Sequence, residues 1–221
     1  MAPARSVKAV LTGDLVGSRQ RDTERIESAI DTLRDAADMI GRMDECHTHF
    51  TRFRGDGWQI FLDSPGLVLT ACIYMSARLR SADLDVETRI AAGLGTVDAI
   101  PGDSLEAARG DAFTISGHLL DQMPRHQRLG LHGSLNVSGD LVTDFHNAIF
   151  ALAEVQIGRW SAPQAEAVAL ALEPDWLTQA DVAARLGISR QAAQKRLSGA
   201  GFNALRVAMQ AFERFDWVPR T

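Results

Sequence analysis

The sequence has few cysteines and no long apolar segment, and each absence excludes a class of protein. Its two cysteines, Cys46 and Cys72, lie far apart, so no disulfide framework is expected and a reducing compartment fits best. The stretch "LVLTACIYMSARL" is interrupted well before the roughly 18 residues that a membrane helix needs. The first residues, "MAPARSVKAVL", contain no apolar region of signal-peptide length. We therefore expect a cytoplasmic protein with no membrane partner.

The chain also lacks an excess of basic residues, since its formal net charge is −5. Residues 1–160 hold 16 Lys/Arg and 22 Asp/Glu (−6), whereas 161–221 hold 7 and 6 (+1). The acidic bulk argues against a protein that coats nucleic acid nonspecifically. It is compatible with a small C-terminal unit that reads DNA through a local basic helix. The hydrophobic fraction of 46% is that of an ordinary globular protein with one or two domains.

Hydrophobic periodicity predicts both strands and helices. Strands are expected at 7–16, twice within 48–63, and at 86–100 and 128–135, and helices at 20–43, 64–82, 110–123, 138–160 and 161–176. The first six elements follow the β-α-β-β-α-β order of a ferredoxin-like domain, which predicts an α+β fold with a mainly antiparallel sheet and helices on one face. The pattern leaves the order of the strands open. Ser138 or Asp140 is expected to cap the helix over 138–160.

Two stretches, "LTGDLVGS" and "RFRGDGWQIF", place an aspartate directly after a glycine at the end of a strand. Turn chemistry alone explains such pairs, because a tight turn needs glycine and tolerates aspartate. If Asp14 and Asp56 instead meet at one edge of the sheet, their carboxylates can hold Mg²⁺ or Mn²⁺ together with nucleotide phosphates. The turn at 15–18 offers backbone N–H groups to phosphate, with Gly17 allowing close approach. The arginines available to neutralise phosphate charge are Arg19, Arg52 and Arg54.

Residues 177–197, "LTQADVAARLGISRQAAQKRL", carry the most specific pattern in the chain. Thr178 and Asp181 have the spacing of a capping box. Gly187 is placed to end that helix, and Ser189 to cap the next one. These offsets are typical of a helix-turn-helix, whose second helix enters the major groove of double-stranded DNA. The side chains that the second helix projects are Arg190, Gln191, Gln194, Lys195 and Arg196.

Within this pattern, Arg190 and Gln191 suit guanine and adenine edges. Lys195 and Arg196 suit contacts with phosphate groups. Two alternatives stay open. Any helical hairpin with a glycine turn gives a similar pattern, and a helix-turn-helix can also serve protein contacts alone.

The stretches "GDLVGS", "RFRGDGWQIF", "RIAAGLGTV" and "GDAFTISGHLL" occur in the order and rough spacing of the class III nucleotide cyclase domain. The same palm-like fold underlies GGDEF-type diguanylate cyclases and the polymerase-like domain of CRISPR effector proteins. This resemblance covers residues from about 5 to 135. The C-terminal pattern resembles sigma-factor-like regulators, and the whole chain is similar to the SatD family of bacterial proteins. We therefore expect a nucleotide-cyclase-like domain over 1–155 and an all-α helix-turn-helix domain over 156–221.

The resemblance implies that Asp14 and Asp56 are the two metal-binding carboxylates, assisted by the backbone carbonyl of Leu15. It also implies a nucleotide-binding role for Val16, Gly17, Ser18, Arg19 and Arg52. Of these, Arg52 falls where cyclases place a lysine that helps to choose the base.

The sequence departs from the cyclase pattern at the positions that stabilise the transition state. Cyclases carry an asparagine and an arginine there, whereas this chain has Thr114 and His118. A base-selecting polar residue is replaced by Ala107. Histidine titrates near neutral pH but lacks a fixed guanidinium fork, and losing such stabilisation costs about 10²–10³ in rate. Thr114 and His118 are catalytic candidates only if the chain is an enzyme.

The favoured hypothesis is a DNA-binding regulator whose N-terminal domain binds a nucleotide with Mg²⁺ or Mn²⁺. Cyclase-like sites often form across a two-fold interface, and helix-turn-helix proteins usually read paired half-sites, so a homodimer is expected. The alternative is an active metal-dependent nucleotidyl cyclase, or a related nucleotidyltransferase, with a helix-turn-helix tail. A third possibility is a protein-interaction module in which both sites have decayed.

Overall fold

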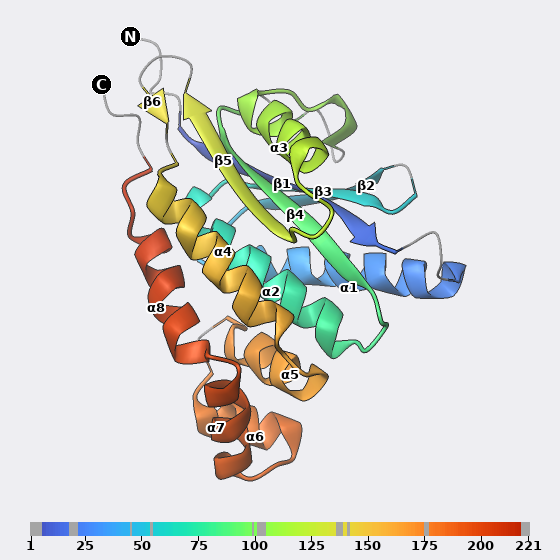
Figure 1. Ribbon diagram of the computed structural model, residues 1–221, viewed down its shortest axis with the longest axis vertical. Coiled ribbons are helices and arrows are strands. Elements are labelled where there is room, and N and C mark those ends of the chain that lie inside the picture. The colour runs from blue at the N-terminus through green and yellow to red at the C-terminus, as the bar shows by residue number, and fades with distance from the viewer. Residues whose placement is uncertain are drawn as a thin grey trace.

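The computed structural model describes residues 6–17, 22–44, 46–53, 55–98, 100, 105–135, 139–140, 142–174 and 177–217. Its strands are β1 (Lys8–Val16), β2 (Thr48–Phe53), β3 (Gly57–Leu62), β4 (Glu87–Gly95), β5 (Leu129–Leu135) and β6 (Gly139–Asp140) (Figure 1). Its α-helices are α1 (Thr23–Ile40), α2 (Val68–Ser81), α3 (Asp111–Gln122), α4 (Asp144–Gly158), α5 (Ala162–Ala171), α6 (Gln179–Leu186), α7 (Arg190–Gly199) and α8 (Phe202–Glu213). Short 3₁₀ turns occur at Pro65–Leu67 and Leu105–Ala107. The fold is therefore mixed α and β, as predicted.

The strands form one sheet in the order β2-β3-β1-β4-β5-β6. β1 lies in its interior and pairs antiparallel with both β3 and β4. The pairing of β4 with β5 is parallel, and the other neighbouring pairs are antiparallel. The prediction of a mainly antiparallel sheet is confirmed. Because β1 runs antiparallel to β3, the last residues of β1 lie beside the β2–β3 turn, at the same end of the strands.

The helices cover both faces of the sheet, so the prediction of helices on one face is wrong. Leu11 of β1 belongs to the main core with α1 and α2. Val10, on the opposite face, packs with Ala112 of α3. The physical reason is the close approach of α3, since a Cβ atom added to Gly93 would lie 2.4 Å from the Ala112 carbonyl oxygen. Figure 1 shows the strands passing between α3 and α1.

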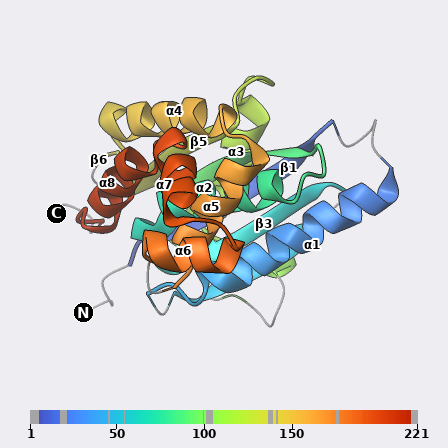
Figure 2. The same cartoon turned by 90° about the horizontal axis from the view of Figure 1, so that it is seen from below.

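The main core continues from the sheet into the C-terminal helices. α2 is buried along most of its length and packs against α1 and β4 as well as α5; Figure 2 shows α5 over α2. The indole N–H of Trp160 donates to the Ala200 carbonyl at 2.9 Å. A guanidinium N–H of Arg80 in α2 donates to the Trp160 carbonyl at 3.0 Å. These contacts fasten the C-terminal helices to the layer beneath the sheet. Among the described residues, no helix is long and apolar enough to cross a membrane.

The helix expected over 138–160 begins later than predicted. Thr143, rather than Ser138 or Asp140, is its N-cap. Asp140 is in β6, where it pairs with β5, and Ser138 lies outside the described residues. The helix starts where a side chain can reciprocate, because His146 Nδ1 accepts from the Thr143 backbone N–H at 3.1 Å. Threonine is a favoured N-cap residue. Histidine, however, is not a typical residue at the third helical position of a capping box, where glutamate or glutamine is usual.

His146 also joins α4 to the end of the chain. Its ring is buried and lies against the rings of Phe212, Phe215 and Trp217, at centroid distances of 4.6–5.2 Å. Burial lowers the pKa of His146 from its ordinary value of 6.5. The neutral ring is therefore the form that the folded chain favours.

We expect the chain to lose stability as the pH falls below about 6.5. The unfolded chain binds a proton on His146 at its ordinary pKa, whereas the folded chain resists protonation. The contribution of His146 to the free energy of unfolding is thus complete above its pKa in the unfolded chain. It is lost as the pH falls from there to the lower pKa of the folded chain. Melting temperatures measured from pH 8 to pH 5 test this. His146→Gln is the matched control, because glutamine completes a capping box without titrating. An equal acid slope in both proteins would contradict the expectation.

Candidate functional site

The two Gly-Asp stretches meet at one end of the neighbouring strands β1 and β3. Asp14 of β1 is the register partner of Gly57 at the start of β3. Next to it, the Leu15 N–H donates to the Asp56 carbonyl at 3.3 Å. The structure thus brings the backbones of both predicted metal-binding residues together, with Leu15 opposite Asp56. Turn chemistry accounts for Gly55, which has φ +79°. It does not account for Gly13, because Gly13 and Asp14 lie within β1 rather than after it, and a Cβ atom at Gly13 would come within 2.3 Å of the Trp58 ring.

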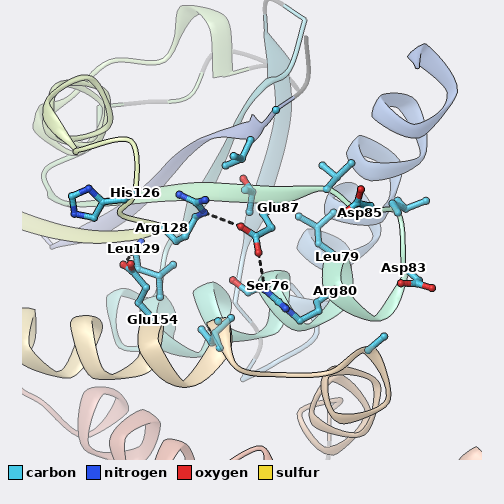
Figure 3. Close-up of a pocket in the computed structure, with 18 of the residues that line it drawn as sticks. Ser76, Leu79, Arg80, Asp83, Asp85, Glu87, His126, Arg128, Leu129 and Glu154 are labelled. Atoms are coloured by element: carbon cyan, nitrogen blue, oxygen red, sulfur yellow. Dashed lines mark hydrogen bonds and ion pairs between the residues drawn. The ribbon is translucent and has the colours of Figure 1, made fainter. Parts of the chain in front are cut away.

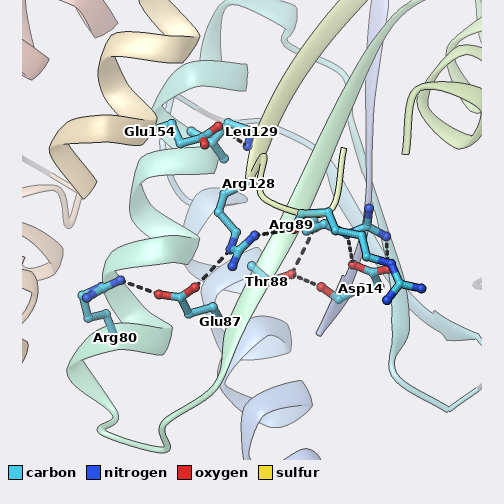
Figure 4. A network of polar contacts seen from close by, with 9 residues as sticks. Asp14, Arg80, Glu87, Thr88, Arg89, Arg128, Leu129 and Glu154 are labelled. Carbon is cyan, nitrogen blue, oxygen red and sulfur yellow. Dashed lines mark hydrogen bonds and ion pairs between the residues drawn. The ribbon is translucent and has the colours of Figure 1, made fainter. Parts of the chain in front are cut away.

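The carboxylate of Asp14 is engaged by Arg89 of β4, its register partner on the other side. Arg89 Nε donates to one carboxylate oxygen at 2.9 Å, and Nη2 donates to the other. The third donor, Nη1, reaches the Met123 carbonyl at 3.3 Å. The hydrogen bonds to Asp14 raise the pKa of Arg89. Figure 4 shows this fork-to-fork pair beside Thr88, whose hydroxyl donates to the Asp14 carbonyl.

The Asp14–Arg89 pair decides how a divalent cation would fit. Two adjoining aspartates are chemically suited to Mg²⁺, but each oxygen of Asp14 already accepts a hydrogen bond from Arg89. Within the described part of the chain, no group of three or more His, Cys, Asp or Glu residues is arranged to hold a metal ion. A divalent cation at Asp14 would therefore compete with the Arg89 guanidinium for the same carboxylate. The sequence analysis did not identify Arg89, although an arginine directly before the apolar run "IAAGLG" was a signal.

The turn that follows Asp14 is described only in part. Val16 ends β1 and is half-buried, and Gly17 is exposed with φ +75°. A side chain at Gly17 would be strained, which suits a backbone turn that leaves its N–H groups accessible. The predicted phosphate-binding residues Ser18 and Arg19 lie outside the described residues, as does Arg54.

Arg52 is tied down by two neighbours. Its terminal nitrogens donate to the two carboxylate oxygens of Glu27 in α1 at 2.7 and 2.9 Å. Its Nε donates to the Gly55 carbonyl at 2.7 Å. The hydrogen bonds to Glu27 raise the pKa of Arg52. In this arrangement Arg52 holds the β2–β3 turn against α1, and it would have to release Glu27 to contact a nucleotide.

The two catalytic candidates lie on the exposed face of α3. Thr114 and His118 are both exposed, whereas Ser116 between them is buried. Ser116 and Thr12 share a hydrogen bond of 2.7 Å between their hydroxyl oxygens, which fixes the inward face of the helix on β1. Within the described residues, neither candidate is hydrogen-bonded to Asp14.

A pocket of about 680 Å³ lies beside the last residue of β1, Val16. It is bounded by Gly17, by α2 and α4, and by the first residues of β4 and β5. Figure 3 shows Glu87 between two arginines at its edge. Arg80 and Arg128 donate to separate oxygens of Glu87 at 2.7 and 3.0 Å. No sequence pattern indicated this pocket, because it is made by segments that are distant along the chain.

The C-terminal pattern has the local geometry predicted for it. Thr178 and Asp181 form the expected capping box, and Gly187 is left-handed with φ +62°. Ser189 accepts from the Ala192 N–H at 3.2 Å. α7 then exposes Arg190, Gln191, Gln194 and Lys195. Arg196 differs from these four, because it is half-buried and donates to Glu166 of α5 at 3.0 Å.

The chain matches no protein-family model and no curated protein. Among solved structures it is similar to a bacterial light-regulated adenylyl cyclase, with a TM-score of 0.40 and 16% identity over 57% of this chain and 76% of that one. A second structure of such a cyclase gives 0.41 and 18%, over 57% and 43%. The non-canonical dimeric guanylyl cyclase domain of the RhoGC fusion protein from the aquatic fungus Blastocladiella emersonii gives 0.35 and 13%, over 59% and 79%. These values describe a distant likeness, which carries no information about activity.

Proposed function

We propose that the chain is a DNA-binding regulator whose sheet-containing part, residues 1–155, binds a nucleotide. The observation that carries the DNA-binding part is the surface of α7. Arg190, Gln191, Gln194 and Lys195 are exposed there. Within the described part of the chain none of these four side chains has a hydrogen bond or an ion pair. Two cations without acidic partners and two amides on one short helix suit phosphate and base contacts in a major groove.

The geometry of the preceding turn supports the same use. Gly187 and the Ser189 cap place the N-terminus of α7 at the protein surface, with Arg190 in its first turn. A helix N-terminus carries partial positive charge and accessible N–H groups, which favour an approaching phosphate. Arg196 is held by Glu166, so we assign it a weaker part in DNA binding than Lys195. Residues 156–221 form the DNA-binding unit in this proposal.

The nucleotide-binding part of the proposal rests on the meeting of the two Gly-Asp stretches. Asp14 and Asp56 would hold Mg²⁺ or Mn²⁺ after Asp14 has exchanged its hydrogen bonds with Arg89 for the cation. The turn at 15–18 would supply N–H groups to the phosphates. The cyclase alternative has less support, because Thr114 and His118 face away from the sheet. They would have to act on a site in another chain.

Duplexes recovered from a random-sequence library by selection against the full chain provide the probe for DNA binding. By fluorescence anisotropy, Arg190→Ala should weaken binding by about 1–3 kcal/mol and relax specificity at one base pair. Lys195→Ala should weaken binding evenly across sequences and reduce the salt slope by about one phosphate contact.

The matched control is Arg206→Ala, which removes the same charge from an exposed position on α8. It should leave both affinity and salt slope unchanged. Failure to enrich any sequence, or equal losses in all three variants, would overturn the DNA-binding proposal. Neither result would bear on nucleotide binding, which is measured separately.

A further inference from the structure

One face of α4 exposes a continuous apolar stripe. Three large apolar side chains lie on it, with exposed fractions of 82% for Phe145, 71% for Leu152 and 51% for Val155. Among the described residues, the other exposed large apolar side chain is Val207 of α8. Ala148 and Ala151 fill the gaps between the three and are exposed as well. Spacings of three, four and seven residues put all of these on one side of a helix.

A stripe of this size needs a partner. Single exposed apolar residues are ordinary on a protein surface, but a contiguous apolar patch marks an interaction site or an aggregation hazard. The opposite side of α4 is already used, since Phe150, Ala153 and Ile157 are buried in the main core. None of the described residues covers the exposed stripe.

The stripe is complementary to itself when two copies of α4 run antiparallel. A two-fold axis between residues 151 and 152 pairs every large side chain with a small one. Phe145 then faces Gly158 of the second copy, Val155 faces Ala148, and Leu152 faces Ala151. Gly158 offers the necessary space, because a Cβ atom added there would meet nothing within 4 Å. Large-to-small matching lets two helices interdigitate at close distance.

The charges at the two ends of α4 follow the same axis. Asp144 begins the helix, and Arg159 follows its last residue. Both are exposed, and neither has an ion pair within the described residues. In the antiparallel arrangement each Asp144 faces Arg159 of the other copy, so two complementary pairs close the ends of the apolar contact. A parallel arrangement would place like charges together, at a cost in stability.

We infer that α4 is the homodimer interface of this protein, packed antiparallel on its own copy about an axis between residues 151 and 152. This inference is independent of the proposed nucleotide and DNA sites. The occupant is a second copy of the chain rather than an unrelated protein, because size and charge both match under one two-fold operation.

Light scattering during gel filtration of the full chain, without DNA or nucleotide, tests the inference. The native chain should have the mass of two copies at micromolar concentration. Leu152→Glu should make it monomeric, raising the dissociation constant at least about a hundredfold, because it buries a charge at the centre of the contact. The matched control is Val207→Glu, which changes a similarly exposed apolar residue on α8 and should leave the dimer intact. A native monomer, or a dimer that survives Leu152→Glu, overturns the inference.

Cross-linking tests the position of the axis. Ala151→Cys places two thiols next to the axis, and both native cysteines are buried. Mild oxidation should therefore link two Ala151→Cys chains, whereas Val207→Cys chains should stay separate. Equal linking of the two variants, or none at Ala151→Cys in a dimeric sample, would mean that the copies meet elsewhere.

Discussion

Arg89→Gln is expected to strengthen Mg²⁺-dependent nucleotide binding at least about tenfold. Arg89 occupies both oxygens of Asp14, so it competes with a cation for the same carboxylate. Removing one partner of a half-buried, hydrogen-bonded charge pair leaves the other about 1–3 kcal/mol less stable. A metal ion that pairs with the freed carboxylate recovers this free energy. Asp14→Ala and Asp56→Ala should each abolish binding, since they remove the ligands themselves.

Isothermal titration with a non-hydrolysable nucleoside triphosphate, with and without Mg²⁺, measures this effect. Pyrophosphate release from a hydrolysable nucleotide in the same samples separates a sensor from an enzyme. Arg185→Gln is the matched control, because it breaks an arginine–carboxylate pair with Glu173 far from Asp14. Weaker binding in Arg89→Gln would make the guanidinium a phosphate ligand rather than a competitor. No binding by any variant would mean that the two Gly-Asp stretches have only a structural role.

Gly93→Ala and Gly117→Ala should change stability in opposite directions. A Cβ atom at Gly93 would lie 2.4 Å from the Ala112 carbonyl oxygen and 2.6 Å from the Ser116 nitrogen. Both are backbone atoms of α3 that cannot rotate away, so the helix must move off the sheet. Overpacking of this kind costs about 1–3 kcal/mol or more. At Gly117 the same methyl group meets nothing within 4 Å, and replacing a helical glycine with alanine gains about 0.5–1 kcal/mol.

Thermal unfolding measures both changes. One kcal/mol corresponds to roughly 2–4 °C for a chain of this size, so the two melting temperatures should differ by several degrees and lie on either side of the native value. Gly93→Ala should also loosen the Thr12–Ser116 hydrogen bond, and hydrogen exchange in α3 should rise. A native-like melting temperature in Gly93→Ala would mean that α3 is not fixed by this contact.

Local patterns predicted most of the elements because their causes are local. Caps and turn glycines act within three or four residues, and so Thr178, Gly187 and Ser189 are found where their offsets placed them. The expectations drawn from the sequence do not include α8, although its residues carry a helical pattern. Its buried residues, Phe202, Leu205, Met209 and Phe212, have the spacing of a helix.

Pairings between distant segments could not be predicted. Arg52 contacts Glu27, and Arg89 contacts Asp14, because strand register and helix packing place them together. A single sequence contains no period or spacing that reports register. The same limit applies to the face of the sheet that α3 covers. That face depends on Gly93, whose missing side chain lets the backbone of α3 approach the sheet. The sequence therefore predicts most of the helices and strands, but not the partners that determine the chemistry of Arg52 and Asp14.

The central position of α2 has a consequence for synthesis of the chain. Its residues are buried on nearly all sides, and the outer layer is supplied by α5, which ends at Ala171. When residues 68–81 leave the ribosome, the helix that will cover them has not been translated. Apolar surface on α2 stays uncovered while roughly 80–100 further residues are added, which takes several seconds at about 5–20 residues per second. We expect the final packing of α2 to wait for the C-terminal helices, and the nascent chain to be prone to aggregation during that interval.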